Sequence, residues 1–176
     1  FEKNGVEYMV KEPENFLGKK IFISGGGDSA LDWAIYFAEK NDSPVGLIHR
    51  SDAFRARKDS VEKVHQLEKE GKIEFYTHAE VVGLNGENIL ESIEIKQKGQ
   101  ENKTVAVDTW LPLFGLSPKL GPIGNWGLEI EKNAIKVDNT LDYQTNIPGV
   151  FAIGDVNTYP GKLKLILCGF HEATLA

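Results

Sequence analysis

The sequence predicts an α/β domain with a parallel sheet, and three observations support this fold class. A short β-branched and aromatic run at 20–24 ends in three glycines, and the segment 30–38 that follows has helical apolar spacing. A breaker segment, Asn-Asp-Ser-Pro at 41–44, stops this helix, and a second apolar run comes at 45–48. Strand, tight turn, helix and strand in this order form a βαβ unit, whose two strands lie parallel in one sheet.

The elements that follow are expected to complete this domain. Apolar residues at helical spacing predict a second helix over 60–70, which Gly71 ends. From 73 to 107 the pattern changes to short alternating runs with turn sequences between them, and predicts an antiparallel meander across one face of the parallel sheet. These runs are 73–76, 80–84, 93–96 and 104–107, and an apolar exit strand is expected at 110–115.

The segments on either side of this domain are less regular. Residues 1–18 are mixed and polar, and predict an entry linker with one short strand at 6–10. A loop is expected over 117–127, where prolines and glycines gather. Beyond it we expect strands at 134–137 and 150–153, and a helix from about 164 to the end.

Composition and charge argue against several classes of protein. The chain has 176 residues, 41% of them hydrophobic and 26% charged, with no apolar stretch near the ~20 residues of a membrane span. Its formal charge of -6 argues against binding to nucleic acid or to a membrane surface, because both need a positive field. The single cysteine, Cys168, fits a reducing cytoplasm and is most simply a packing residue. Since Phe1 is no initiator methionine and no signal sequence follows it, we expect the chain to start within a longer protein.

The six residues Gly25, Gly26, Gly27, Asp28, Ser29 and Ala30 fit the pattern G-x-G-x-x-A directly between the first strand and the first helix. In this context the first glycine permits a tight turn, the third lets the backbone approach a pyrophosphate, and the alanine lets helix and strand pack closely. The free N–H groups of the helix N-terminus receive the anion. The pattern therefore predicts a Rossmann-like dinucleotide site, and the alternative is a glycine turn in an unrelated α/β domain.

A basic pair, His49 and Arg50, follows the second strand, where the residue that meets the adenosine ribose is expected. An NAD site favours Asp or Glu at this place. Arg50, with Arg55 and Arg57 shortly after it, offers guanidinium groups for a 2′-phosphate instead. The loop predicts NADP(H) as the cofactor, and the alternative is a solvated basic loop.

A third candidate pair is Gly154 and Asp155, which follow the strand expected at 150–153. Ligands of parallel sheets bind at the carboxyl ends of strands, so Asp155 there would meet a hydroxyl of a cofactor. By its chemistry alone it is equally well a turn residue or a helix cap.

Taken together, these strings resemble the ferredoxin/flavodoxin–NADP reductases of the thioredoxin-reductase type over nearly the whole chain. The matching segments are 15–20 (NFLGKK), 25–34 (GGGDSALDWA), 49–56, 120–128, 145–155 (TNIPGVFAIGD) and 159–166 (YPGKLKLI). The resemblance implies a Rossmann-like, three-layer NADP(H)-binding domain at 16–114. It implies that 1–15 is a linker at the end of a first FAD segment and that 115–176 is part of a second FAD segment.

The resemblance also implies functions for particular residues. Asp155, after Gly154, would contact the ribityl-phosphate region of FAD, and the segment around Lys164 and Leu165 would approach the flavin ring through a helix N-terminus. The full-length protein would pass hydride from NADPH to FAD and then electrons to ferredoxin or flavodoxin, as a cytoplasmic homodimer. We expect no catalytic acid or base and no metal, and a structural function for His49 and His171.

Two alternatives come from the same residues. Thioredoxin reductase itself carries a CxxC pair shortly before the NADP glycine turn, and by spacing Tyr8 and Lys11 stand at those places, which disfavours a disulfide reductase. A nucleotide-binding or sensor module without turnover is the second alternative. One departure from the family pattern is Ser51, where many relatives have another arginine, and its loss would weaken binding of a 2′-phosphate.

Overall fold

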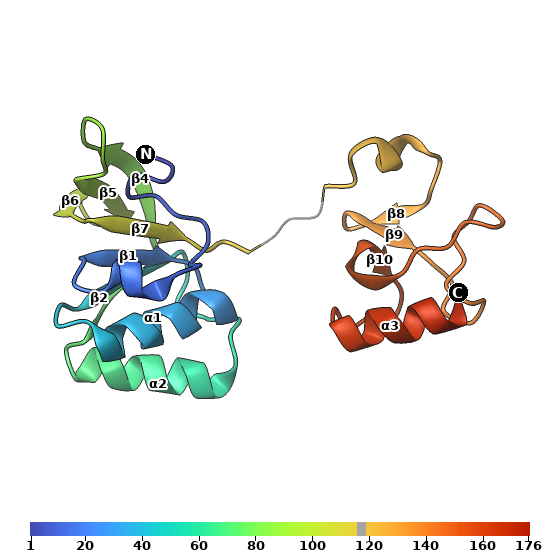
Figure 1. The fold of residues 1–176 in the computed structure, drawn as a ribbon, viewed down its shortest axis with the longest axis horizontal. Coiled ribbons are helices and arrows are strands. Elements are labelled where there is room, and N and C mark those ends of the chain that lie inside the picture. The colour runs from blue at the N-terminus through green and yellow to red at the C-terminus, as the bar shows by residue number, and fades with distance from the viewer. Residues whose placement is uncertain (116–118) are drawn as a thin grey trace. The chain divides into compact units, whose positions relative to one another are not determined.

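The computed structural model describes residues 1–115 and 119–176, and the chain forms two compact units, Phe1–Gly115 and Leu116–Ala176 (Figure 1). The loop expected at 117–127 begins outside the described residues. We describe each unit by itself. No helix in the described part of the chain is both long enough and apolar enough to span a membrane.

The first unit is built on a four-stranded parallel sheet with the order β3-β2-β1-β7. Its strands are β1 (Ile21–Ser24), β2 (Val45–His49), β3 (Ile73–Thr77) and β7 (Thr109–Pro112). Helix α1 (Asp28–Lys40) connects β1 to β2, and α2 (Lys58–Lys69) connects β2 to β3. The predicted βαβ unit and both predicted helices are confirmed.

This sheet lies between two layers, α1 and α2 on one face and an antiparallel meander on the other (Figure 1). The meander consists of β4 (Ala79–Asn85), β5 (Ser92–Gln97) and β6 (Lys103–Ala106). Because successive side chains of a strand point to opposite faces, Ile21 and Ile23 pack with the helices whereas Phe22 packs with the meander. The expected three-layer α/β arrangement is confirmed.

Two predicted strands of the first unit are wrong in part. The run 73–76 is β3 of the parallel sheet and no part of the meander. It alternates because β3 is an edge strand, with Glu74 exposed. Within the strand expected at 6–10, Val6 alone pairs, through isolated bridges to Glu2 and Trp110, and Tyr8 and Met9 are more than 60% exposed.

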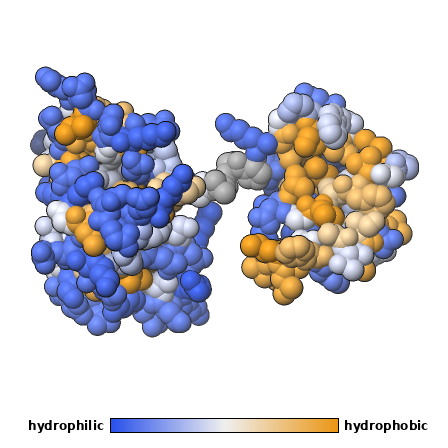
Figure 2. Space-filling model, in the orientation of Figure 1, coloured by the Kyte–Doolittle hydropathy of each residue, from blue (hydrophilic) through white to orange (hydrophobic). Residues whose placement is uncertain are grey.

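The second unit has a small sheet with the order β10-β9-β8 and one longer helix. Its elements are η2 (Gly121–Asn125), β8 (Ile130–Glu131), β9 (Ala134–Lys136), η3 (Gly154–Val156), β10 (Asn157–Thr158) and α3 (Ile166–Leu175). The strand expected at 150–153 is a single bridge between Phe151 and Gln144, and the helix expected from about 164 begins at Ile166. Hydrophobic side chains cover much of the face of the second unit that is seen in Figure 2, and α3 itself exposes Ile166, Leu167 and Phe170.

Candidate functional site

The glycine turn leaves β1 and enters α1 by a close packing of backbones. The Gly25 N–H donates to the carbonyl oxygen of Ile48 at 3.0 Å, which ties the end of β1 to β2. A Cβ on Gly25 would lie 2.5 Å from the Leu113 carbonyl oxygen and 2.8 Å from Cβ of Ala30. Ala30 is fully buried. The strand and the helix therefore approach so closely that glycine and alanine are the residues that fit here.

Gly27 is the N-cap of α1, and the space beside it is open. A Cβ at this position would meet no heavy atom within 4 Å, and among the described residues no side chain caps the helix. The first N–H groups of a helix have no partner within it and carry a partial positive charge. This open, uncapped N-terminus fits the pyrophosphate of a dinucleotide, with Asp28 and Ser29 exposed on the first turn.

His49, at the end of β2, lies against the glycine turn rather than in solution. A Cβ on Gly26 would come within 2.2 Å of the His49 Cε1, so the imidazole occupies the space that a larger residue would need. The same ring stacks on Phe54 with centroids 5.0 Å apart. Its Nε2 lies 3.2 Å from the Ala53 carbonyl oxygen and 3.1 Å from the Ser51 Oγ. These contacts hold the imidazole against the turn, and the structural function of His49 stays a prediction.

The basic loop after His49 is fastened to the glycine turn by backbone hydrogen bonds. The Arg55 N–H donates to the Gly26 carbonyl oxygen at 2.7 Å, and the Arg57 N–H donates to Asp28 Oδ1 at 2.9 Å. Within the loop, the Ser51 hydroxyl donates to the Ala53 carbonyl oxygen at 3.1 Å. Ser51 therefore shapes the loop, although an arginine at this place would offer a phosphate contact.

The three arginines of the loop are in different electrostatic situations. Arg57 lies 3.6 Å from a carboxylate oxygen of Asp28 and 3.6 Å from one of Asp32, so its charge offsets two carboxylates at the start of α1. Arg50 and Arg55 are exposed, and in the described part of the chain neither forms an ion pair. Their guanidinium groups are available to an anion at the helix N-terminus.

The second unit holds the other expected residues at two neighbouring elements. Gly154 begins η3 with φ +75°, a conformation that favours glycine, and Asp155 is exposed on this turn. Asp155 therefore lies on a short helical turn and does not end a strand as expected. Leu165 is the N-cap of α3 without a side-chain cap bond, and Lys164 and Leu165 are both exposed.

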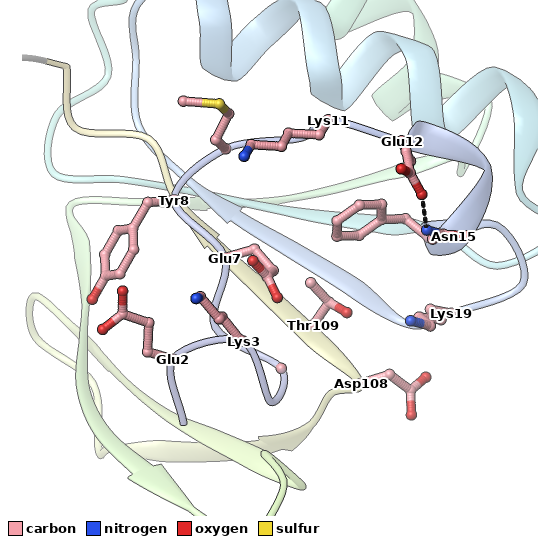
Figure 3. Close-up of a pocket in the computed structure, with 13 residues that line it drawn as sticks. Glu2, Lys3, Glu7, Tyr8, Lys11, Glu12, Asn15, Lys19, Asp108 and Thr109 are labelled. Atoms are coloured by element: carbon pink, nitrogen blue, oxygen red, sulfur yellow. Dashed lines mark hydrogen bonds between the residues drawn. The ribbon is translucent and has the colours of Figure 1, made fainter.

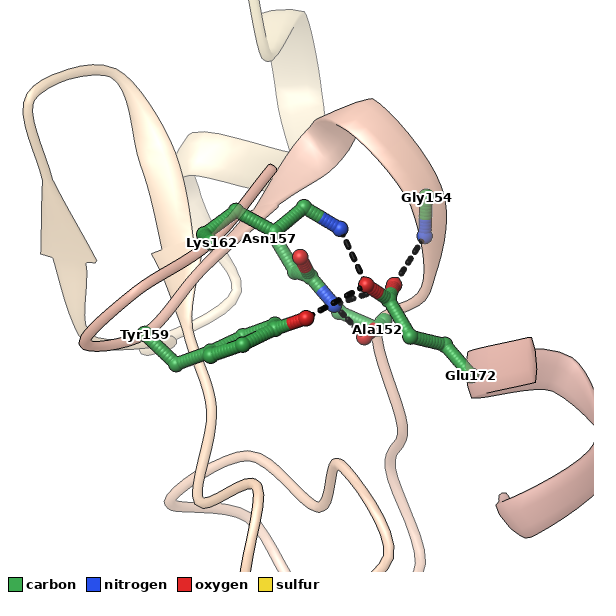
Figure 4. Close-up of polar contacts among 6 residues, drawn as sticks. All are labelled: Ala152, Gly154, Asn157, Tyr159, Lys162 and Glu172. Carbon is green, nitrogen blue, oxygen red and sulfur yellow. Dashed lines mark hydrogen bonds and ion pairs between the residues drawn. The ribbon is translucent and has the colours of Figure 1, made fainter. Parts of the chain in front are cut away.

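A buried carboxylate, Glu172 of α3, joins these two elements (Figure 4). It accepts hydrogen bonds from the Gly154 N–H at 2.7 Å, the Asn157 amide at 2.9 Å and the Tyr159 hydroxyl at 2.9 Å, and it pairs with Lys162. Burial by itself raises the pKa of a carboxyl, but these four donors outweigh burial and lower the pKa of Glu172. Burial and the bond to Glu172 raise the pKa of the Tyr159 hydroxyl.

A pocket of about 510 Å³ lies elsewhere in the first unit, between the N-terminal segment and the start of β7 (Figure 3). Lys19, Asp108 and Thr109 line it at the amino ends of β1 and β7, whereas ligands of such sheets bind at the carboxyl ends. The pocket is also lined by Tyr8 and Lys11, which by spacing stand at the places of the CxxC cysteines, and neither side chain carries a thiol. The pocket is therefore separate from the glycine turn.

Two groups of residues escaped sequence reasoning. The contact of Arg57 with Asp28 and Asp32 joins residues more than 20 positions apart, and no local sequence pattern predicts it. The cluster around Glu172 did leave a signal, because a glutamate stands among mostly apolar residues of α3. An acidic residue in such a helix needs buried partners.

Comparison with known proteins agrees with this geometry. The model of the family described as pyridine nucleotide-disulphide oxidoreductase matches residues 3–173. The ferredoxin–NADP reductase of Flavobacterium johnsoniae is 63% identical over 175 residues, which cover 99% of this chain and 49% of that protein. Ferredoxin–NADP reductase 2 of Christiangramia forsetii is 63% identical over 179 residues, covering 99% of this chain and 50% of that protein.

A solved structure gives the same result for the fold. The crystal structure of Lactococcus lactis thioredoxin reductase matches with a TM-score of 0.81 at 29% identity, covering 99% of this chain and 56% of that one. The chain spans about half the length of the curated relatives it matches. The expected resemblance and fold class are confirmed. By the match to its family model along nearly its whole length, the chain belongs to the pyridine nucleotide-disulphide oxidoreductases.

Proposed function

We propose that this chain is the NADP(H)-binding part of a flavoprotein oxidoreductase, with part of the FAD site attached. Residues 16–114 bind NADP(H), 115–176 contribute to the FAD site, and 1–15 lead in from a first FAD segment. The observation that carries the proposal is the open space at Gly27, at an uncapped helix N-terminus to which a basic loop is fastened. The names of the relatives at 63% identity support it.

In this proposal the first unit binds the nucleotide by its backbone and orients it by its arginines. Gly25, Gly26 and Gly27 bring the chain close to the pyrophosphate, and the N–H groups of Asp28 and Ser29 face it. Arg50 and Arg55 bind the 2′-phosphate, and Arg57 keeps Asp28 and Asp32 from repelling it. His49 holds the loop in shape.

The second unit offers donors and surface that fit FAD. Asp155 is an exposed carboxylate for a ribityl hydroxyl, and the uncapped N-terminus of α3, preceded by Lys164 and Leu165, fits the polar edge of a flavin. When bound, FAD would accept hydride from NADPH and release single electrons. The protein supplies binding and orientation for this chemistry. Ferredoxin or flavodoxin as the acceptor, a full-length homodimer and a cytoplasmic location complete the proposal and rest on the resemblance.

Isothermal titration of this chain with NADP⁺ and with NAD⁺ at low salt tests the nucleotide site. We expect tighter binding of NADP⁺, weakened about tenfold or more by Arg50→Ala, which corresponds to about 1.4 kcal/mol. Lys40→Ala, in the last turn of α1, is the control and should leave the affinity unchanged. Equal or absent binding of both nucleotides would overturn the proposal for the first unit.

The flavin part has its own test in the full-length protein. A reductase should be isolated yellow with bound FAD. A colourless protein that binds NADP⁺ would favour the sensor module instead.

A further inference from the structure

The carboxylate of Glu172 divides its hydrogen bonds between its two oxygens. Oε2 accepts from the Gly154 N–H and from the Asn157 amide, whereas Oε1 accepts from the Tyr159 hydroxyl and the Lys162 ammonium group. Four donors use the lone pairs of an ionised carboxylate almost completely. Glu172 is fully buried, so these donors replace water.

The donors on Oε2 stand at the two ends of one turn. Gly154 begins η3 and Asn157 directly follows it, so Asp155 lies between two residues that the same oxygen holds. Asn157 also donates to the Ala152 carbonyl oxygen at 2.7 Å, which ties the chain two residues before the turn to the residue directly after it. Figure 4 shows these contacts converging on Glu172 from η3 and β10.

The side-chain amide of Asn157 has an orientation that leaves its buried oxygen without a hydrogen-bond partner among the described residues. Both of its hydrogen-bond partners are acceptors, so the nitrogen must face them. Its Oδ1 is then buried and has no partner in the described part of the chain. The turn is therefore held in one arrangement even though a buried acceptor stays unpaired.

Helix α3 also packs against the η3 turn at Gly169, about one helical turn before Glu172. A Cβ on Gly169 would lie 3.4 Å from Cα of Gly154, so α3 and η3 pack almost backbone to backbone. Glu172 comes three residues later and takes the Gly154 N–H. Contact and hydrogen bond together fix the turn at one place along α3.

We propose that Glu172 is a positioning residue, which holds the carboxylate of Asp155 and the N-terminus of α3 at the spacing that FAD requires. Through Oε2 it sets the geometry of the turn, and through Oε1 it is neutralised by Lys162. This inference rests on the proposed function, because Asp155 and the start of α3 are proposed there to bind the flavin. It predicts that the two oxygens have separable effects on flavin binding.

Two variants in the full-length protein separate these effects. Glu172→Gln retains one acceptor oxygen, which the Lys162 ammonium group attracts, so the amide nitrogen faces the Gly154 N–H. Tyr159→Phe removes one donor from Oε1 and leaves the bonds to Gly154 and Asn157 in place. We expect the dissociation constant of FAD, measured by flavin fluorescence, to rise about tenfold or more in Glu172→Gln and less than about threefold in Tyr159→Phe.

Hydrogen exchange of the Gly154 amide gives a second readout that does not depend on flavin. In the ¹⁵N-labelled chain we expect slow exchange, which Glu172→Gln accelerates and Tyr159→Phe leaves slow. If both variants lose FAD in proportion to their loss of stability, Glu172 has a structural function alone and the inference is overturned.

The remaining outcomes separate this inference from the proposed function. A full-length wild-type protein that takes up no FAD overturns the proposed flavin site and, with it, the function assigned to Glu172. A yellow protein whose FAD affinity is unaffected by Glu172→Gln overturns the inference and leaves the proposed function intact. If Glu172→Gln does not fold, fast exchange of the Gly154 amide in the wild-type chain overturns the inference.

Discussion

The backbone N–H of Arg55 donates to the carbonyl oxygen of Gly26 at 2.7 Å, across 29 residues of sequence. This bond joins the loop after β2 to the turn after β1. A βαβ unit brings the carboxyl ends of its two strands to the same edge of the sheet, so the loop and the turn meet there. The relationship places the backbone of the basic loop beside the N-terminus of α1.

Alanine substitutions at two adjacent glycines should have opposite effects on stability and binding. Gly27→Ala adds a methyl group in open space, so we expect the free energy of unfolding to change by less than about 1 kcal/mol. The methyl group would occupy the space of the pyrophosphate, and NADP⁺ affinity should fall about tenfold or more. Titration calorimetry and urea unfolding measure the two quantities.

Gly26→Ala is the matched comparison. Its methyl group would collide with the His49 ring, so we expect a loss of about 1–3 kcal/mol of stability from overpacking. A stable Gly26→Ala chain would show that His49 does not pack against the turn. Full binding by Gly27→Ala would mean that the pyrophosphate lies elsewhere.

Arg57→Ala should weaken nucleotide binding with little effect on folding. Its ion pairs with Asp28 and Asp32 are exposed, and exposed pairs contribute little to stability. Without Arg57 the two carboxylates repel an anion at the start of α1, and we expect an affinity loss of about threefold to tenfold at low salt. Added salt should diminish the difference.

The control for Arg57 is Lys63→Ala. It removes another ion pair at the surface, between Lys63 and Glu39 at 2.9 Å, that bridges α2 and α1. NADP⁺ affinity should stay unchanged in this variant. An equal loss in both variants would indicate a general effect of positive charge rather than the local one.

Trp110→Phe should destabilise the first unit through a buried hydroxyl. The Trp110 Nε1–H donates to Ser24 Oγ at 2.8 Å, and Ser24 is 3% exposed at the end of β1, next to the glycine turn. Leaving this hydroxyl without its donor costs about 1–3 kcal/mol. Urea unfolding of Trp110→Phe, Ser24→Ala and the double variant measures the contribution of this hydrogen bond to the free energy of unfolding. The hydrogen bond contributes nothing if the two single losses add up to the loss of the double variant.

The second unit should lose stability in acid because of Glu172. Its pKa in the folded protein is below the ordinary value of 4.5, so its contribution is complete above that pH and is lost as the pH falls below it. Scanning calorimetry between pH 7 and pH 3 should show the unfolding midpoint falling below about pH 4.5.

Glu172→Gln removes this pH dependence together with about 3–5 kcal/mol of stability, because the buried Lys162 ammonium group loses the negative charge that neutralises it. Glu129→Gln, which breaks an exposed pair with Lys136, should retain the acid transition. An acid transition that persists unchanged in Glu172→Gln must come from other carboxyl groups.

Local sequence patterns predict many of the helices and strands of the first unit correctly. The run 20–24, the three glycines and the helical spacing of 30–38 predict β1, the turn and the start of α1, because all three signals come from neighbours in sequence. The run 73–76 was misassigned because an edge strand of a parallel sheet alternates like a strand of a meander.

The candidate site was predictable in its backbone and not in its side-chain contacts. G-x-G-x-x-A locates the turn, and the position of Arg50 follows from the end of β2. That His49 lies against Gly26, and that Arg57 pairs with Asp28, depends on how the two loops meet in space. The bond from Gly154 to Glu172 likewise joins residues 18 positions apart.

The basic loop keeps its shape through contacts that do not involve the side chains of Arg50 and Arg55. The His49 ring packs against Gly26 and Phe54, and the Ser51 hydroxyl donates to the Ala53 carbonyl oxygen. The backbone N–H groups of Arg55 and Arg57 donate to Gly26 and Asp28. Under the proposed function, substitutions at 50 and 55 therefore alter which nucleotide is preferred without remodelling the loop. In evolution, or in engineering a preference for NAD, the nucleotide selectivity of the loop can then change while its backbone conformation stays the same.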